Sequence, residues 1–474
     1  MSLYKAAAIS RYLSALLAAA LLLGGCDGDV VQEQDEPPRT AFVHLFEWDW
    51  PSVARECEDF LGPAGYAAVQ VSPPQEHVEG PQWWTRYQPV SYEIISRGGD
   101  REQFTDMVKR CAAVGVDIYV DAVINHMTGV YAGKGVAGTE FGEYEYPGLY
   151  VYDDFHHCDR NDGDDIVDFD DLYEVQHCEL VNLADLKTES ETVRTKLAGF
   201  LNDLLSIGVA GFRIDAAKHM PPGDIAAVLD KLDKDAFVFQ EVIYHGTGPI
   251  AGSDYLMNGS VTEFQYSPLL EQAFLEGNIA AVRNVGSVET FLPSNDAVVF
   301  ADNHDTQRGH WGEAFNYTAG DRYILANVFM LAYPYGYPKV MSSYAFDDKE
   351  AGPPDTIPIA PGDNSCSEAW VCEHRHPVIA SMVGFRNDTH GEPATNWQEH
   401  GESAVSFGRG DRGHVVLNAG DEPISVSVTT NLPPGDYCNI LAADSMDCDL
   451  VTVGDGGTFE VSVEGVSAIA IYTD

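Results

Sequence analysis

The sequence predicts an α/β protein built on a (β/α)8 barrel, with a small inserted domain after the third strand and a C-terminal antiparallel β domain. Two observations predict the barrel. Eight short apolar runs alternate with helical stretches, a pattern typical of βα units and a parallel sheet. Polar side chains gather where these runs end, and in such barrels that edge holds the active site.

The composition indicates a large, acidic, globular protein. The chain has 474 residues, of which 45% are hydrophobic and 11% aromatic, enough for a large core and for two or three domains. It contains 27 Lys and Arg against 74 Asp and Glu, a net charge of −47. This charge excludes a nucleic-acid partner, which needs a basic face. The abundant aromatic residues argue against disorder.

The first 26 residues differ from the rest. Lys5 and Arg11 precede an apolar run, Leu13–Leu23, and then Gly-Gly-Cys26, an order typical of a secretory signal. The run is too short to cross a membrane comfortably. Because Leu-Gly-Gly-Cys resembles a bacterial lipobox, we expect Cys26 to carry the lipid that anchors an exported protein to a bacterial membrane. The alternative is a plain signal peptide (1–26), an incidental Cys26 and a secreted protein. Residues 27–39 are expected to form an acidic tether.

Eight cysteines remain beyond Cys26, and an exported chain can keep them as disulfides. Eight cysteines allow many pairings. Short spacing makes Cys366–Cys372 and Cys438–Cys448 plausible, and the other four can pair as Cys57–Cys111 and Cys158–Cys178. Reduced structural cysteines are the alternative.

The barrel is expected to span residues 40–387. The apolar runs that predict its strands are Ala41–Phe46, Ala67–Val71, Asp117–Ile124, Gly211–Ile214, Phe237–Val242, Ser260–Phe264, Ala297–Ala301 and Lys339–Ser342. Residues 127–185, between the third and fourth runs, are too many for an ordinary loop and predict the inserted domain. Within them, Asp159–Asp165 lacks the closing Glu of an EF-hand, so we interpret it as solvated surface.

From residue 388 onward the pattern changes. Apolar and polar residues alternate, as in Ile424–Val428, and this alternation predicts an antiparallel β domain over 388–474.

Three strand ends carry carboxylates: Asp215, Glu241 and Asp305. A single Asp at such a place is often only a helix cap, but three on one rim indicate shared chemistry. Retaining glycosidases need one carboxylate to attack the anomeric carbon and one carboxylic acid to protonate the leaving oxygen, roughly 5 Å apart. The rim offers carboxylates of the kind that this chemistry needs.

Four segments resemble the signature regions of α-amylases of glycoside hydrolase family 13, most closely the chloride-dependent, animal-type subgroup, here in a bacterial lipoprotein context. These segments are Asp121–His126, Gly211–His219, Glu241 and Asn303–Asp305. The resemblance runs from about Ala41 to the C-terminus. It also covers Trp83–Pro89, Gly384–Asn387 and Phe407–Gly410.

The resemblance implies an endo-acting α-amylase that hydrolyses internal α-1,4 bonds of starch or glycogen with retention. Asp215 would be the nucleophile, Glu241 the general acid/base, and Asp305 the carboxylate that holds the sugar and favours the oxocarbenium-like transition state. Glu241 must then be protonated while Asp215 stays ionised, and Arg213 can hold Asp215 charged. The alternatives are a relative that acts on another α-glucan or transglycosylates, and a non-catalytic glucan-binding homologue. The presence of all three carboxylates argues against the last.

Substrate-binding residues are also implied. Four histidines, His126, His219, His304 and His310, would hydrogen-bond sugar hydroxyls, although a single His is more often a core residue. Lys218 and Ile243 would line the leaving-group side. An aromatic segment, Trp83, Trp84 and Tyr87 with Gln88, offers rings that stack on a pyranose, and a hydrophobic cluster beneath a loop is its alternative.

Two ions are implied. The family holds calcium, which prefers oxygen ligands, between barrel and inserted domain. The matching positions are Asn125 and Asp185 by side chain, and Gln176 and His219 by main-chain carbonyl. Chloride near the acid would be held by Arg213, Asn303 and Lys339, for which ordinary ion pairs with the catalytic carboxylates are the alternative.

The chain departs from the family pattern in two places. Trp311–Phe315 stands where animal enzymes carry a longer glycine-rich loop. An extra disulfide of vertebrate members has no cysteines here, whereas the eight cysteines match four family bridges in the pairing given above. We expect a monomer.

Overall fold

The computed structural model describes residues 38–160, 163–287, 290–309, 315–360, 365–442 and 448–473. The predicted signal, Cys26, most of the tether and His310 lie outside these residues. Within them, no helix is both long and apolar enough to cross a membrane.

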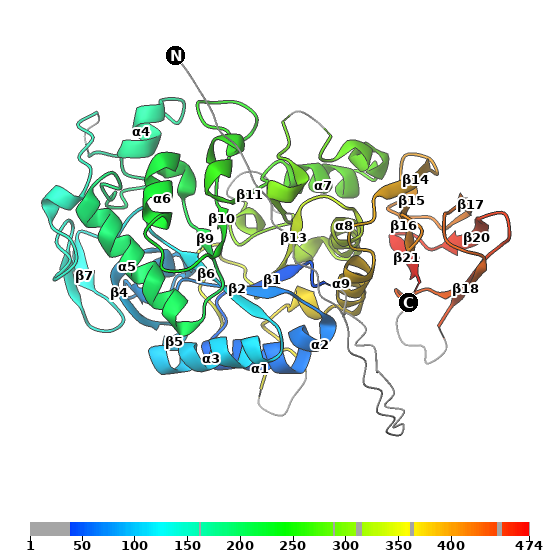
Figure 1. Cartoon of the computed structure of the whole chain (residues 1–474), viewed down its shortest axis with the longest axis horizontal. Coiled ribbons are helices and arrows are strands. Elements are labelled where there is room, and N and C mark those ends of the chain that lie inside the picture. The colour runs from blue at the N-terminus through cyan, green and yellow to red at the C-terminus, as the bar shows by residue number, and fades with distance from the viewer. Residues whose placement is uncertain are drawn as a thin grey trace, which may run out of the picture. The chain divides into compact units, whose positions relative to one another are not determined.

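Eight parallel strands close into a barrel in the order β1-β13-β12-β11-β10-β9-β6-β2 (Figure 1). Their bounds are β1 (Phe42–Leu45), β2 (Ala68–Val71), β6 (Asp117–Ala122), β9 (Gly211–Ile214), β10 (Phe237–Gln240), β11 (Ser260–Thr262), β12 (Ala297–Val299) and β13 (Tyr337–Ser342). Each strand overlaps one predicted run. Several runs continue past their strands because the next apolar residues, such as Val123 and Ile124, are fully buried in the rim loops.

Helices alternate with these strands. They are α1 (Trp50–Glu56), α2 (Gly62–Ala64), α3 (Arg101–Ala113), α4 (Leu172–His177), α5 (Glu191–Ile207), α6 (Pro222–Leu229), α7 (Tyr266–Leu275), α8 (Asp321–Ala332) and α9 (Pro377–Asp388). Helix α3 shows how local sequence sets them. Asp100 and Gln103 form a reciprocal cap at its start. Phe104, Met107, Val108 and Cys111 recur at helical spacing and are buried against the barrel.

The inserted domain lies between β6 and α5. It contains β7 (Ala132–Lys134), β8 (Glu140–Gly142) and α4, and buries a cluster of aromatic rings: Phe141, Tyr146, Tyr150 and Phe155. A smaller sheet, β3 (Gln75–His77), β4 (Pro89–Ser96) and β5 (Gly99–Asp100), follows β2.

Antiparallel strands form the C-terminal domain. They are β14 (Ala394–Glu399), β15 (Ala404–Arg409), β16 (Gly413–Asn418), β17 (Ile424–Thr429), β18 (Gly435–Cys438), β19 (Leu450–Val453), β20 (Thr458–Val463) and β21 (Ser467–Tyr472). Four of them make the sheet β14-β15-β16-β21, and the rest pair as β17–β20 and β18–β19. The predicted fold class, including this domain and the insertion, is confirmed.

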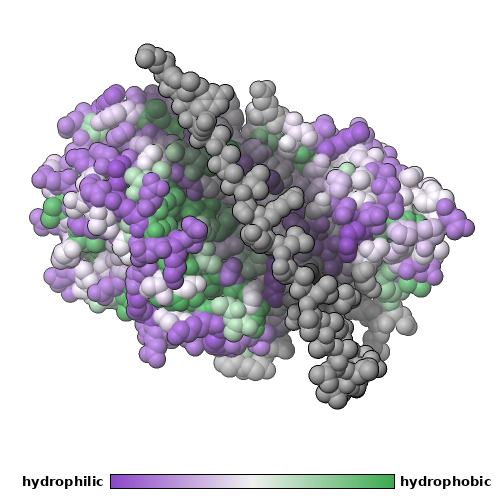
Figure 2. All heavy atoms as spheres, in the orientation of Figure 1, coloured by the Kyte–Doolittle hydropathy of each residue, from purple (hydrophilic) through white to green (hydrophobic). Residues whose placement is uncertain are grey.

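Disulfides and surface fit the sequence. The structure contains Cys57–Cys111, Cys158–Cys178, Cys366–Cys372 and Cys438–Cys448, the pairing expected above. On the face shown in Figure 2, hydrophilic residues predominate and hydrophobic residues form smaller patches, as the acidic composition leads one to expect.

Candidate active site

One guanidinium, Arg213, brings the rim carboxylates together. Arg213 lies on β9, two residues before Asp215, so both side chains point to the same side of the strand. Its Nη1 lies 2.7 Å from Asp215 Oδ1, and its Nη2 lies 2.6 Å from Glu241 Oε1. Asp305 belongs to the same charged group, because Glu241 and Arg213 both act on it electrostatically. All three carboxylates are nearly buried.

The backbone at the strand ends fixes Asp215 and Glu241. The Asp215 N–H donates to Ala122 O (3.1 Å) and the Glu241 N–H to Ile214 O (2.9 Å), so the barrel ladder continues through both residues. Ala216 takes a left-handed conformation with φ 49°, and its N–H donates to Glu241 Oε2 at 2.9 Å. The main chain thus aims Glu241 toward the nucleophile candidate.

A fourth carboxylate, Asp121 on β6, belongs to the cluster, and the sequence reasoning gave it no role. Its Oδ1 lies 2.5 Å from Arg213 Nη1, and its Oδ2 accepts from Tyr87 Oη at 2.9 Å. Asp121 is fully buried and directly opposite Arg213 in the β6–β9 register. The signal that could have found it is an Asp placed within an apolar strand, since a buried charge needs a partner.

Burial and crowding perturb these groups. Burial raises the pKa of Asp215 well above its usual range, and Glu241 and Asp121 add to the rise, whereas Arg213 opposes it. Burial and Glu241 raise the pKa of Asp305 to about 7. Burial disfavours the charge of Arg213, but Asp121, Glu241 and Asp215 together raise its pKa well above normal. One guanidinium therefore pairs with several carboxylates, and burial together with their mutual repulsion favours the protonated forms of Asp215 and Asp305.

The ring nitrogens of His126 and His219 make hydrogen bonds to other parts of the protein. His126 Nε2 donates to Tyr87 O (3.0 Å), and its Nδ1 accepts from Asn125 Nδ2 (3.2 Å), so both ring nitrogens have protein partners. His219 donates from Nδ1 to Val175 O at 3.0 Å. Burial lowers the pKa of His126 and of His219 to about 4. His126 thus ties the end of β6 to the aromatic segment, a role that the sequence did not predict.

His304 connects the aromatic segment with Asp305. Its ring stacks on Tyr87 with centroids 5.1 Å apart, and its Nε2 lies 3.3 Å from Asp305 Oδ2. Trp83 is only 5% exposed and packs edge-on against His304, whereas Trp84 is half-buried. Gln88 accepts from the Gly129 N–H at 3.0 Å.

Lys218 and Ile243, predicted to line the leaving-group side, both lie near the end of β10: the Lys218 N–H donates to Glu241 O at 3.2 Å. The Lys218 side chain is half-buried, and burial lowers its pKa. Ile243, also half-buried, follows β10.

The predicted calcium ligands offer oxygen donors. Asn125 Oδ1 is buried and has no hydrogen-bond partner within the described ranges. Asp185 accepts from His156 Nδ1 at 2.7 Å, and burial raises its pKa to about 6. His219 contacts the helix that carries Gln176 through Val175 O. Among the described residues, no three or more His, Cys, Asp or Glu side chains form a metal-holding group. A cation here would rely on amide and carbonyl oxygens as well, a donor set that suits calcium.

Lys339 stands apart from the carboxylate cluster. It is 1% exposed, its Nζ lies 5.0 Å from the Phe300 ring centroid, and no ion pair of it is found in the described part of the chain. Burial and Arg213 lower its pKa to about 8. Asn303 Oδ1 accepts from the Asp305 and Thr306 N–H groups. Arg213 and Lys339 are thus two buried cations that act on each other electrostatically, and within the described residues only Arg213 has an ion pair.

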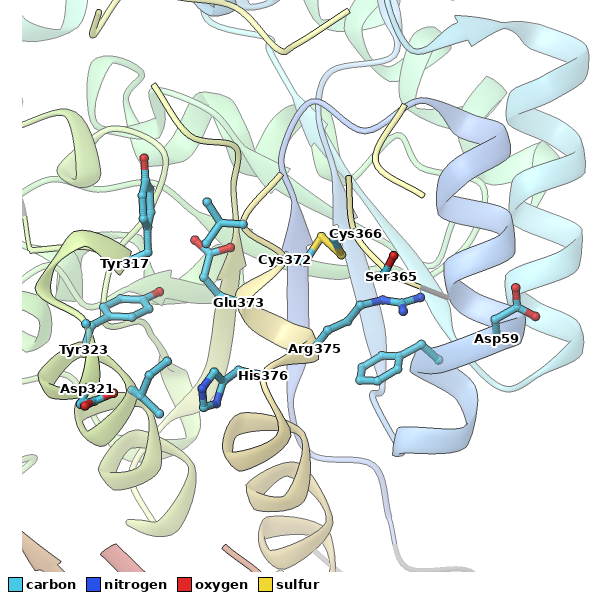
Figure 3. Close-up of a pocket in the computed structure, with 14 residues that line it drawn as sticks. Asp59, Tyr317, Asp321, Tyr323, Ser365, Cys366, Cys372, Glu373, Arg375 and His376 are labelled. Atoms are coloured by element: carbon cyan, nitrogen blue, oxygen red, sulfur yellow. A yellow bond between two sulfur atoms is a disulfide. The ribbon is translucent and has the colours of Figure 1, made fainter. Parts of the chain in front are cut away.

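A separate pocket of about 730 Å³ contains none of these carboxylates (Figure 3). Two of its charged groups already have protein partners: Glu373 accepts from the Ser343 N–H at 2.7 Å, and Arg375 pairs with Glu56 at 2.5 Å. The Arg213 cluster is therefore the candidate active site.

Comparisons with known proteins agree with this geometry. The α-amylase catalytic-domain model matches residues 65–259, and the α-amylase C-terminal all-β model matches residues 395–474. An α-amylase of Streptomyces violaceus is 44% identical over 432 residues, 91% of this chain and 73% of its own. Human α-amylase 2B is 43% identical over 486 residues, 92% of this chain and 95% of its own. The structure of α-amylase I from Eisenia fetida superposes with a TM-score of 0.87 at 37% identity, over 92% of this chain and 98% of that one. Matches of this identity and length place the chain in the α-amylase family of glycoside hydrolases.

Proposed function

We propose that Asp215, Glu241 and Asp305 carry out α-amylase catalysis in this chain. The glycoside hydrolase activity follows from the family: internal α-1,4 bonds of starch, glycogen and related glucans are hydrolysed with retention. The observation that supports the residue assignment is the single guanidinium of Arg213, which contacts both Asp215 and Glu241.

The mechanism has two displacements. Ionised Asp215 attacks the anomeric carbon while Glu241 gives its proton to the leaving glycosidic oxygen, so a glycosyl–Asp215 ester forms and the leaving chain departs with a hydroxyl. Glu241, now a carboxylate, takes a proton from water, whose oxygen attacks the anomeric carbon and releases Asp215. Arg213 opposes the effect of burial and favours the ionised form of Asp215, as attack on the anomeric carbon requires.

Asp305 is proposed to hold sugar hydroxyls and to favour positive charge at the anomeric carbon. The stacking of His304 on Tyr87 places the aromatic segment next to it. Trp83, Trp84, Tyr87, His126, His219, His310, Gln88, Lys218 and Ile243 are proposed to complete the substrate site.

The test is hydrolysis of soluble starch by Glu241→Gln and Asp215→Asn. Both variants should fold and lose several orders of magnitude in kcat, because one removes the nucleophile and the other the proton donor that the two displacements require. Glu241→Gln activity within about tenfold of wild type would contradict the assignment. The wild-type product profile separates an endo-hydrolase from a transglycosylase or a non-catalytic glucan binder.

We further propose that calcium is held by Asn125, Asp185 and the carbonyls of Gln176 and His219, where it would join the barrel to the inserted domain. Bound calcium favours the folded state, because a ligand that binds only that state stabilises it. Chelation with EDTA should therefore lower the melting temperature, and added calcium should restore it.

Chloride is proposed to lie between Arg213, Asn303 and Lys339, where it would neutralise a charge that otherwise favours ionised Glu241. The four disulfides and the N-terminal pattern support the proposal that the protein is exported. A lipid on Cys26 is proposed to anchor it to a membrane. The enzyme is proposed to be a monomer.

A further inference from the structure

The segment that carries the two tryptophans lies between β3 and β4. It includes a short 3-10 helix, Trp83–Tyr87, and an irregular stretch before it. The indole of Trp83 donates to Lys349 O at 2.9 Å and the indole of Trp84 donates to Glu350. Both acceptors lie 266 positions further along the chain than the indole that donates to them.

Arg97, directly after β4, contacts the segment itself. Its Nη2 donates to Gly80 O (2.9 Å), to Gln82 O (3.0 Å) and to Thr85 Oγ1 (2.9 Å). These acceptors lie on both sides of Trp83 and Trp84 in the sequence. One guanidinium therefore fixes the backbone before the tryptophans and a side chain after them.

Glu47 holds Arg97 in place. Glu47 follows β1, and its Oε2 lies 3.2 Å from Arg97 Nη1 and 3.1 Å from Arg86 Nη1. The Glu47 N–H donates to Ser72 Oγ at 2.9 Å, and its backbone is left-handed with φ 65°. The side chain of Glu47 is fully buried, so its direction is set by the surrounding protein.

Arg86 completes the arrangement at the other end of the aromatic segment. Its Nε donates to Pro73 O at 2.9 Å, and its Nη2 donates to Ser96 Oγ at 3.3 Å. One carboxylate oxygen of Glu47 thus links two arginines that anchor the segment on either side. We call Glu47, Arg86 and Arg97 the clamp.

We propose that Arg97, held by Glu47, positions the Trp83–Trp84 pair for stacking on glucan and acts on substrate binding rather than on bond cleavage. The proposal rests on the proposed function. No ion pair or hydrogen bond found among the described residues joins Arg97 or Glu47 to Asp215 or Glu241. Loss of the clamp should therefore loosen the tryptophans and leave the nucleophile and the acid in place.

Arg97 is the member of the clamp to replace. Its side chain is 22% exposed, whereas those of Arg86 and Glu47 are fully buried. Without Arg97, Glu47 keeps Arg86 as a partner. Without Glu47, two guanidinium groups would lose their counter-ion.

The experiment measures maltohexaose binding by calorimetry in a Glu241→Gln background, which keeps the oligosaccharide intact. Adding Arg97→Gln should raise Kd by about fivefold or more. Adding Arg101→Gln is the matched control, because Arg101 lies four positions after Arg97 and pairs with Asp203 on the surface. This control should change Kd by less than about twofold. Arg97→Lys keeps a cation for Glu47, so its Kd should lie between those of the Arg97→Gln and Arg101→Gln proteins.

In the active enzyme, Arg97→Gln should raise KM for starch by a similar factor and change kcat by less than about twofold. An unchanged Kd in both Arg97 variants, or a fall in kcat with constant KM, would overturn the clamp proposal alone. If the Glu241→Gln parent binds no maltohexaose, the proposed function fails and the clamp proposal fails with it. Should Arg97→Gln unfold, Arg97→Lys decides by the same measurements.

Discussion

The Arg213 cluster and the clamp combine the same two chemical groups in opposite proportion. In the cluster, one guanidinium faces the carboxylates of Asp121, Asp215 and Glu241. In the clamp, one carboxylate, Glu47, faces two guanidinium groups. Both are buried, and burying ion pairs is weak evidence of a gain in stability because desolvation opposes the attraction.

The proportion decides what each can do. Excess carboxylates relieve their repulsion by keeping a proton, and the raised pKa values of Asp215 and Asp305 follow from this together with burial. Excess guanidinium groups have no such relief, since Arg stays protonated at any working pH. The cluster can therefore give and take protons, whereas the clamp can only hold a shape.

Replacing Arg213 should have the largest effect. Arg213→Gln removes the only group that forms ion pairs with these three buried carboxylates among the described residues, so protonation of the carboxylates, Asp215 included, becomes more favourable. We expect kcat on starch to fall by about 10³-fold or more. Kinetics of Arg213→Gln beside Arg97→Gln provides the measurement. If both lowered kcat equally, the distinction between the two sites would collapse.

Much of this architecture could be predicted. Apolar runs with short spacing gave all eight barrel strands, because a parallel strand covered on both faces is apolar throughout. The three rim carboxylates were found because polar residues at strand ends stand out against such runs.

The clamp could not be predicted, because Glu47, Arg86 and Arg97 are separated in sequence and each looks like an ordinary charged residue. Their pairing depends on how β1 and the loop after β3 meet. The structural role of His126 was missed for a related reason, since its partner, Tyr87 O, is a backbone atom and leaves no trace in the sequence.

The raised pKa of Asp305 should make the stability of the protein depend on pH. The folded pKa of Asp305 is about 7, raised from its usual 3.8 by burial first and then by Glu241. Between about pH 4 and 7 the unfolded chain loses this proton and the folded chain keeps it, so the free energy of unfolding falls as pH rises. In Asp305→Asn this decrease in the free energy of unfolding should be absent. As pH rises from 4 to 8, the free energy of unfolding of the variant minus that of wild type should therefore increase by about 2–4 kcal/mol.

Urea unfolding of both proteins at the two pH values measures this difference. Arg97→Gln, which changes a site without excess carboxylates, is the control and should show no such pH-dependent gain. A constant difference between wild type and Asp305→Asn would mean that Asp305 ionises normally in the folded protein.

Chloride should change the rate by a smaller factor. Without an anion, the Lys339 ammonium favours ionised Glu241 and weakens the general acid. Removing chloride should lower kcat by about tenfold and move the alkaline limb of the pH–rate curve to lower pH. Lys339→Gln should be nearly indifferent to chloride, because the anchor and the harmful charge are both gone. Curves of kcat against pH, with calcium and ionic strength fixed, test this. Identical wild-type curves with and without chloride would show that chloride has no role in catalysis.

Salt should have the smallest effect, and it should act outside both buried sites. The net charge of −47 means that surface carboxylates repel one another, and salt screens this repulsion over a Debye length of about 10 Å at 0.1 M. The melting temperature, at constant calcium, should therefore rise by a few degrees between about 10 mM and 1 M NaCl. Screening barely reaches Arg213 and Glu47, since their side chains are 2% and 0% exposed. Lys339→Gln should show the same rise, because surface repulsion does not depend on the chloride site. A rise confined to wild type would instead assign the effect to the bound anion.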